Sequence, residues 1–252
     1  MTNLRADAVV LDIEGTIGSL THVRDVLFPY ARRRLADWFG RHRDDPRLEA
    51  LLHAVREEAG RPELDETGAL AVLVAWSDAD VKAAPLKTVQ GWIWAEGYAE
   101  GDLHGHVYSE VPSVLRRWRA DGMRVFTYSS GSAKAQLDWF GHTAYGDLTG
   151  LLDDRFDLEN AGPKNDPGSY RRIGLMIGGS AVPPVFLSDT AYELDAAAAA
   201  GWTGVGVRRD DDPRGTEVPG HVTVTALDRL HLGPAPAATR AHDQTVGEVF
   251  FS

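Results

Sequence analysis

The spacing of apolar residues indicates two kinds of secondary structure in the first half of the chain. Residues 8–11, AVVL, form a continuous apolar run of the kind found in a strand that is buried on both faces of a sheet. From residue 23 to residue 39, apolar side chains recur every three or four positions, which predicts an amphipathic helix that ends at Gly40. Further helices are predicted over residues 46–59, 66–76 and 82–97.

After residue 108 the pattern alternates between amphipathic segments and short apolar runs. Helices are predicted over residues 109–120, 132–140, 170–177 and 192–200, and strands over residues 123–128, 185–187, 203–207 and 221–225. Such alternation predicts a parallel sheet with helices on both faces, because parallel strands need crossover connections. The fold class is therefore predicted to be α/β.

The order of these segments predicts a core domain that is interrupted by a helical insertion. Residues 1–20 and 109–232 are expected to form the α/β core, and residues 21–108 an all-helical cap over the carboxyl edge of the sheet. Ligands of such sheets bind beyond the carboxyl ends of the strands. Residues 233–252 are rich in Pro and Ala at first, and we expect a partly disordered tail there.

Composition and charge exclude several classes of function. The chain has 252 residues, 43% hydrophobic and 25% charged, as in a soluble globular protein. The formal net charge of −11 disfavours nucleic acid as a partner, because phosphates attract Lys and Arg. The absence of cysteine excludes disulfides and thiolate metal sites. We recognise no signal peptide and no run of about 20 apolar residues, so we expect a cytoplasmic protein without a membrane partner.

Polar residues follow three of the predicted strands. Asp12 and Glu14 come after the first strand, Ser129 and Ser130 after the second, and Asp189 shortly after the third. Each group is ambiguous by itself, since strands commonly end in polar turns and Ser130 could simply cap the following helix. Because parallel strands end at one edge of a sheet, we expect these side chains to lie close together.

Together with Lys164, these residues supply the parts that phosphoryl transfer needs. The Asp12 carboxylate can attack phosphorus, and Glu14 can protonate the leaving oxygen and then take a proton from water. Lys164 adds positive charge to the transition state, and Ser130 at a helix start can bind phosphate. Crowded carboxylates favour a hard cation, so we expect Asp12, the backbone carbonyl of Glu14 and Asp189 to hold one Mg²⁺ per chain.

Several segments between residues 8 and 208 carry a more specific signal than these residues alone. The segments are DIEGT, DVLFPYA, LKTVQGWIWAEGY, HVYSEVP, YSSGSAKAQ, GDLTGLL, FLSDT and DAAAAAG. They resemble the enolase-phosphatase family, also called acireductone synthases, within the haloacid dehalogenase superfamily. The resemblance includes segments of the predicted cap. It implies a Rossmann-like core of the haloacid dehalogenase type with an inserted helical cap.

The resemblance also implies a bifunctional, Mg²⁺-dependent enzyme of methionine salvage. Members of the family enolise 2,3-diketo-5-methylthiopentyl-1-phosphate and then remove its phosphate, which gives the acireductone. By position, the family's metal and phosphate ligands fall on Asp12, Glu14, Ser129, Ser130, Lys164 and Asp189. The expected partner is a small phosphorylated metabolite, while the choice between a monomer and a homodimer stays open.

The chain departs from the family pattern directly after DIEGT, where Ile17, Gly18 and His22 replace two threonines and an aromatic residue. These positions could touch the substrate. The alternative is therefore a related phosphatase that acts on another phosphorylated ketone or sugar, without an enolase step. A binding protein on an inactive phosphatase fold is disfavoured, because the acids and the lysine of the site are all present. The sequence leaves open whether Glu14 or a cap residue is the base for enolisation.

Four further features have expected places in the fold. Glu193 lies one helical turn after Asp189 and is expected to support the metal site. Trp94 is expected to pack inside the cap, with a position facing the cleft as the alternative. His22 is expected to be solvated or to cap a helix. The charged run RRDDDPRG, residues 208–215, is expected to be a solvated loop.

Overall fold

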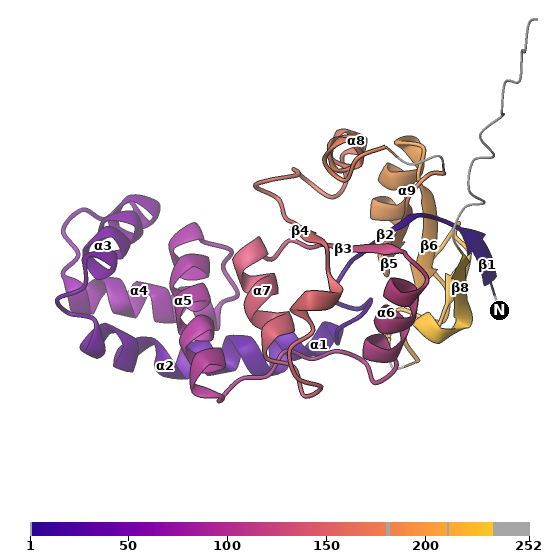
Figure 1. The fold of residues 1–252 in the computed structure, drawn as a ribbon. Helices are drawn as coiled ribbons and strands as arrows, with labels where there is room; N and C mark the ends of the chain where they lie inside the picture. Colours follow the sequence, from indigo (N-terminus) through magenta and orange to yellow (C-terminus); the bar gives the residue numbers. More distant parts are fainter. Residues whose placement is uncertain (1, 180–181, 211, 234–252) are drawn as a thin grey trace, which may run out of the picture.

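A computed structural model describes residues 2–179, 182–210 and 212–233, and a six-stranded parallel sheet lies at its centre (Figure 1). The order of strands across the sheet is β4-β3-β2-β5-β6-β7. Their bounds are Ala8–Leu11 for β2, Arg124–Tyr128 for β3, Asp154–Phe156 for β4, Val185–Ser188 for β5, Thr203–Val207 for β6 and Thr223–Val224 for β7. The first apolar run of the sequence thus lies between β3 and β5. This arrangement confirms the predicted α/β class.

Helices cover both faces of the sheet, and alternate residues of β2 point into two separate hydrophobic clusters. Val9 and Leu11 pack with residues of α6 and α7 on one face. Ala8 and Val10 pack with residues of α8 and α9 on the other face. These helices are α6 (Val111–Ala120), α7 (Ala133–Gly141), α8 (Pro167–Met176) and α9 (Ala191–Ala199). The burial of both faces explains why β2 is continuously apolar.

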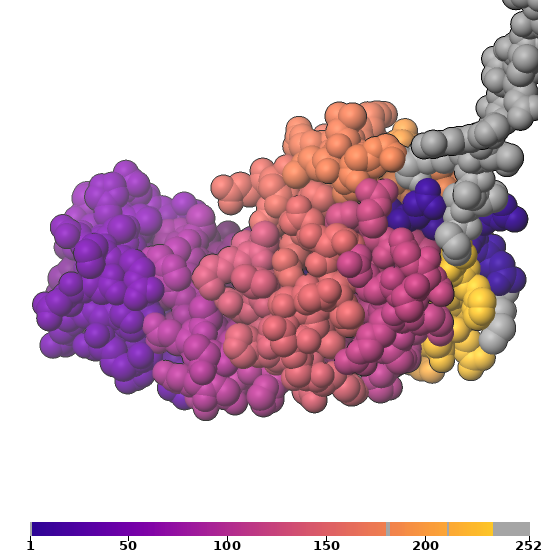
Figure 2. Space-filling model, viewed as in Figure 1, coloured from indigo at the N-terminus to yellow at the C-terminus, as the bar shows by residue number. Residues whose placement is uncertain are grey.

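The remaining helices form a lobe at one end of the molecule (Figures 1 and 2). The chain enters it through α1 (Leu20–His22) and a π-helical turn, η1 (Val23–Leu27). The lobe then consists of α2 (Phe28–Arg41), α3 (Pro46–Ala59), α4 (Glu66–Asp78) and α5 (Ala84–Glu100). It lies in the stretch for which the sequence predicts a cap. Among the described residues, no helix is both long and apolar enough to cross a membrane.

The hydrophobic pattern did not predict the second sheet or several of the short elements. β1 (Thr2–Arg5) and β8 (Leu230–Gly233) pair in parallel as a second sheet. β4 has three residues and the 3₁₀ turns η2 (Thr149–Leu151) and η3 (Leu227–Arg229) also have three, too few to show a period. Of the predicted tail, Gly233 ends β8, and residues 234–252 lie outside the described part of the chain.

Two connecting segments join the lobe to the sheet, and hydrogen bonds tie them to each other. The Tyr108 amide donates to the carbonyl of Ile17 at 3.0 Å, and the Ser19 amide donates to His106 Nδ1 at 3.0 Å. The indole of Trp139 on α7 donates to the His106 carbonyl at 3.1 Å. These bonds hold both connections against the core, so the lobe lies over the carboxyl edge of β2 and β3.

Within the lobe, α2 and α5 approach most closely where a glycine faces a tyrosine. A Cβ added at Gly97 would lie 2.7 Å from the ring and hydroxyl of Tyr30. Tyr30 cannot simply swing away, because its hydroxyl donates to Asp102 at 3.2 Å and the guanidinium of Arg34 covers its ring. Gly97 is therefore required by the packing of two helices.

Replacing Gly97 by Ala is expected to lower the free energy of unfolding by about 1–3 kcal/mol, because the extra methyl overpacks this contact. The measurement is urea denaturation followed by far-ultraviolet circular dichroism. Gly91→Ala is the matched control in the same helix, since nothing lies within 4 Å of a Cβ there. The control is expected to gain up to about 1 kcal/mol from helix propensity. Equal stability of the two variants would contradict the packing argument.

Candidate active site

Asp12 is the first residue beyond β2 and lies buried at the carboxyl edge of the sheet. Its amide donates to the carbonyl of Leu187 in β5 at 2.9 Å, which fixes the backbone. One carboxylate oxygen accepts a hydrogen bond from Lys164 Nζ at 2.5 Å, and the other accepts one from the Thr16 hydroxyl at 2.8 Å. Burial raises the pKa of Asp12, the charge of Lys164 lowers it and that of Asp189 raises it again. The net direction is upward.

Lys164 lies between two buried carboxylates, as a charged lysine in a protein interior requires. Its ammonium is 2.5 Å from Asp12 and 2.7 Å from Glu193. Burial alone would lower the pKa of Lys164, but the charges of Asp12 and Glu193 outweigh it and raise that pKa. The Tyr170 hydroxyl donates to the Lys164 carbonyl at 2.8 Å and holds the loop before α8. Lys164 is therefore charged and fixed beside Asp12.

Glu193 has Lys164 as its charged partner. Its carboxylate pairs with Lys164 and accepts a hydrogen bond from the Ser188 hydroxyl at 2.8 Å. Burial and the nearby Asp12 charge raise the pKa of Glu193 to about 7. Glu193 therefore contacts Lys164, which in turn pairs with Asp12, one of the expected metal ligands. Its supporting role at the metal site stays a prediction.

Asp189 lies beside Asp12, and the hydroxyl of Thr16 joins the two. This hydroxyl donates to Asp12 and accepts a hydrogen bond from the Asp189 amide at 3.0 Å. Gly15 has a φ of +80°, and a Cβ there would collide with the Asp189 carboxylate. The outer oxygen of that carboxylate pairs with Arg214. The loop after β2 is thus shaped to bring two carboxylates together.

The donor atoms fit a hard divalent cation. The described residues contain no group of three or more His, Cys, Asp or Glu side chains that could hold a metal. The predicted Mg²⁺ ligands include only two such side chains, the carboxylates of Asp12 and Asp189, together with the backbone carbonyl of Glu14. Mg²⁺ commonly binds through one or two carboxylates and keeps several waters. The upward effect of Asp189 on the pKa of Asp12 also shows that the two carboxylates repel each other, which a cation would relieve.

Ser129 and Ser130 lie in the turn between β3 and α7. The Ser129 amide donates to the Phe156 carbonyl at 3.1 Å, and its hydroxyl accepts from the Gly131 amide at 3.1 Å. Ser132, and not Ser130, caps α7 by accepting a hydrogen bond from the Ala135 amide. The side chain of Ser130 is therefore not needed as a cap.

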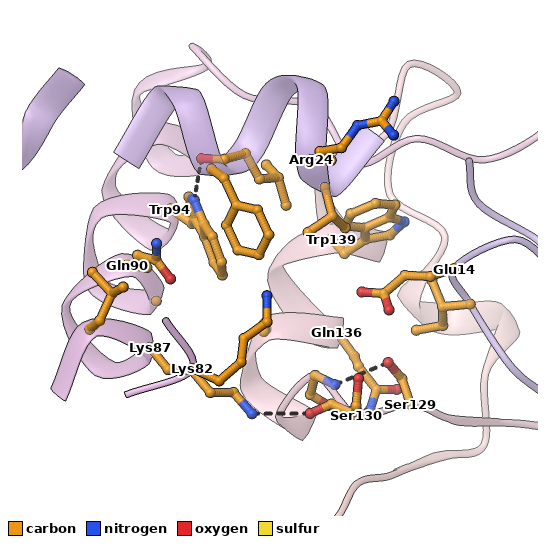
Figure 3. Close-up of a pocket in the computed structure, with 18 of the residues that line it drawn as sticks. Glu14, Arg24, Lys82, Lys87, Gln90, Trp94, Ser129, Ser130, Gln136 and Trp139 are labelled. Carbon is orange, nitrogen blue, oxygen red and sulfur yellow. Dashed lines mark hydrogen bonds between the residues drawn. The ribbon is translucent and has the colours of Figure 1, made fainter. Parts of the chain in front are cut away.

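A cavity of about 590 Å³ opens between this turn and the helical lobe (Figure 3). The core contributes Glu14, Ser129, Ser130, Gln136 and Trp139, and the lobe contributes mainly Leu27, Phe28, Lys82, Leu86, Lys87 and Trp94. The Glu14 carboxylate points into the space, and burial, followed by the Asp12 charge, raises its pKa. Trp94 donates its indole N–H to the Leu27 carbonyl at 2.8 Å and faces the cavity. Trp94 therefore packs within the lobe, as expected, and also faces the cleft.

The three departures from the family pattern do not line this cavity. Ile17 is fully buried, and a Cβ at Gly18 would lie 2.8 Å from the carbonyl of His106. The half-buried His22 packs the edge of its ring on Trp139 at 5.2 Å. All three therefore belong to the connection between core and lobe. The expectation that His22 is solvated is wrong. His22 does stand at the N-cap position of η1, but its side chain makes no cap hydrogen bond there.

Among the described residues of the charged run 208–215, the expected solvated loop holds for the exposed residues Asp210, Pro213, Arg214 and Gly215, and is wrong for the buried Arg208 and Arg209. Arg209 is buried and donates to the Thr16 carbonyl at 2.7 Å, and Arg214 pairs with Asp189. Thr16, Arg209 and Arg214 are the site residues that the sequence analysis missed. A run of charged residues is normally predicted to be exposed. Here the position of β6, the strand before the run, brings these side chains to the site.

Comparison with known proteins places the chain in a family. No family model matches it. A protein of Nocardia farcinica named enolase-phosphatase E1 is 48% identical over 231 residues, which cover 92% of this chain and 99% of that protein. The chain belongs to the enolase-phosphatase family. The resemblance found in the sequence is thus confirmed, and members of this family are phosphoric monoester hydrolases.

Solved structures agree with this assignment. The UTR4 protein of Saccharomyces cerevisiae is 31% identical and aligns with a TM-score of 0.70 over 86% of this chain and 96% of its own. The hydrolase YfnB of Bacillus subtilis, of the haloacid dehalogenase type, aligns with a TM-score of 0.55 over 90% of this chain and 97% of its own. At 12% identity, YfnB supports the fold alone.

The connection between core and lobe is expected to weaken at acid pH through His22. Burial, and then the charge of His106, lower the pKa of His22 below the usual histidine value of about 6.5. Below that value the unfolded chain binds a proton that the folded chain resists, so stability falls as the pH falls. His22→Phe keeps an aromatic ring on Trp139 and is expected to reduce the loss of unfolding free energy between about pH 8 and about pH 5.

Urea denaturation at both pH values measures this difference. His53→Phe, on the exposed face of α3, controls for the removal of one imidazole. A His22→Phe variant with the same pH dependence as the wild type would show that burial of His22 does not affect stability.

Proposed function

We propose that this protein is a Mg²⁺-dependent enolase-phosphatase that acts on 2,3-diketo-5-methylthiopentyl-1-phosphate in methionine salvage. The observation that carries the proposal is a buried Asp12, 2.5 Å from Lys164, beside a cavity into which Glu14 points. Family membership supports the same reaction. We further propose that the enzyme is cytoplasmic and takes a small phosphorylated metabolite.

The phosphatase half requires a nucleophile, a proton donor and charge compensation. In this proposal an Asp12 oxygen attacks phosphorus, the bond to the substrate oxygen breaks, and Glu14 gives its proton to that oxygen. The raised pKa of Glu14 favours the protonated form that this step needs. Glu14 then takes a proton from a water molecule, which attacks the aspartyl phosphate, releases inorganic phosphate and restores Asp12.

The other side chains hold these groups and the phosphate in place. Lys164 and Thr16 donate to separate oxygens of Asp12 and fix its orientation. Ser129 and Ser130 lie at the start of α7, where a phosphate finds hydroxyls and amides. Mg²⁺, held by Asp12, the Glu14 carbonyl and Asp189, would offset the negative charge of the phosphate.

The opposite wall of the cavity supports the proposed substrate. Leu27, Phe28, Leu86 and Trp94 provide an apolar surface for an alkyl thioether end. The alternative, a phosphatase for another ketone or sugar phosphate without an enolase step, was motivated by Ile17, Gly18 and His22. Ile17 is fully buried, and Gly18 and His22 pack in the connection between core and lobe, which places them away from a substrate in this cavity. Asp12, Lys164 and Asp189 also lie outside the cavity lining, so the lining by itself does not separate the two functions.

Asp12→Asn is expected to lower phosphate release by at least about 10³-fold while the fold survives, because the variant lacks the nucleophile. The assay follows phosphate and the ultraviolet absorbance of the transient enol, with Mg²⁺ and with EDTA. EDTA is expected to abolish phosphate release, and added Mg²⁺ to restore it. Asp44→Asn, at an exposed position between α2 and α3, is the matched control.

Two results would contradict the proposal in different ways. Substantial phosphate release by Asp12→Asn would exclude the aspartyl-phosphate route. Phosphate release by the wild type without any transient enol would favour the alternative phosphatase.

A further inference from the structure

The loop between α4 and α5 brings a lysine over the cavity. Lys82 Nζ lies 5.3 Å from the centre of the Phe28 ring and 2.5 Å from an Asp80 oxygen. Figure 3 shows the ammonium group directed into the cavity, while the Glu14 carboxylate enters from the opposite side. An ammonium group has three donors, and Asp80 occupies one of them. Lys82 therefore retains donors for a ligand.

The backbone of Asp80 is unusual for its residue type. Among the described residues it is the one non-glycine residue with a positive φ, at +52°. Its position is the left-handed turn that ends α4, where the Val81 amide donates to the Trp76 carbonyl at 2.9 Å. An L-residue other than glycine, asparagine or aspartate rarely adopts this conformation.

Two other helices of the lobe end with the same turn and show which residue suits it. α3 ends at Gly60 and α5 at Gly101, with φ of +63° and +79°. Each is closed by an amide donating back to the carbonyl five residues earlier, at 2.9 Å: Arg61 to Arg56, and Asp102 to Gly97. Glycine would satisfy the turn of α4 equally well. The aspartate costs conformational free energy there, and what it adds is the bond to Lys82.

The other charged groups of the cavity differ from Lys82 in their partner or in their place. Of the carboxylates that line it, Asp80 pairs with Lys82 and Asp138 with Lys134 at 2.8 Å, which leaves Glu14 to act on a ligand. Lys87 donates to the Ser130 carbonyl at 3.3 Å, near the phosphate end. Lys82 is thus the lysine that can meet the middle of a substrate whose phosphate lies at Ser130.

We propose that Lys82 is a catalytic residue of the enolisation step, an inference that rests on the proposed function. Glu14 takes a proton from the carbon next to a ketone. The electrons of that C–H bond form the carbon–carbon double bond, and the π electrons of the ketone move to its oxygen. Lys82 donates a hydrogen bond to this oxyanion, and Asp80 is the positioning residue that aims it. This assigns the base to Glu14, the choice that the sequence leaves open.

Lys82→Met keeps the length of the side chain and removes its charge. It is expected to slow enol formation from the diketone phosphate by about 10²–10³-fold. Hydrolysis of p-nitrophenyl phosphate, which needs no enolisation, is expected to stay within about twofold of the wild-type rate. Lys134→Met, which removes a largely exposed lysine from α7, is the matched control and is expected to change neither rate.

The Asp80→Gly variant separates the effect of Asp80 on the position of Lys82 from its effect on the stability of the fold. It is expected to raise Tm, because glycine suits the left-handed turn, and yet to slow enol formation, because Lys82 loses its partner. Asp80→Asn keeps a residue that tolerates the turn and removes the charge, so it is expected to slow the same step. A merely structural role for Asp80 would make Tm and enol formation change in the same direction.

Three results would overturn the inference. Enol formation by Lys82→Met at the wild-type rate would remove Lys82 from the mechanism and leave the proposed function intact. Equal losses of enol formation and of p-nitrophenyl phosphate hydrolysis would place Lys82 in phosphate binding instead. A wild-type protein that releases phosphate without an enol would overturn the proposed function, and the inference with it.

Discussion

Three ionisable side chains meet at the carboxyl edge of the central strands, where Lys164 lies between Asp12 and Glu193. Each would be costly to bury alone, and removing one partner of a buried pair commonly costs about 3–5 kcal/mol. The cluster therefore has to form as a unit. It requires β2 beside β5, the loop before α8 folded over the edge, and α9 starting directly after β5. The same unit fixes the Asp12 carboxylate, which is the nucleophile of the proposed function, so stability and the proposed activity depend on the same contacts.

The helical lobe has a different role, which is to form one side of the cavity. It contributes apolar walls and cations to a cavity whose acids come mainly from the core. Two of its long helices end in glycine, as helix geometry favours, while α4 ends in Asp80. The exception occurs where the chain enters the cavity, and conformational strain commonly collects at such sites. The turns after α3 and α5 thus use glycine, while the turn after α4, which lines the cavity, uses an aspartate.

The connections between the two parts explain how the chain can depart from its family without losing the site. Ile17, Gly18 and His22 follow the acids at once in sequence, yet the chain turns away from the cavity after Glu14. Gly18 and His22 lie against His106 and Trp139, and Ile17 is fully buried in the hydrophobic core. Neighbours in sequence are therefore poor guides to neighbours in a site when a tight turn lies between them.

The sequence by itself determined most of the longer strands and helices along the chain, because a strand buried on both faces and an amphipathic helix leave different hydrophobic periods. It also indicated Asp12, Glu14, Ser129, Ser130, Lys164 and Asp189 as a group, because parallel strands end at one edge. Tertiary structure decided the partners. Contacts between segments far apart in the chain decide that Glu193 pairs with a lysine. Such contacts also decide that Arg209 is buried and that Arg214 pairs with Asp189. A local pattern records the burial and charge that a residue prefers, but the identity of its partner is set only when those segments pack together.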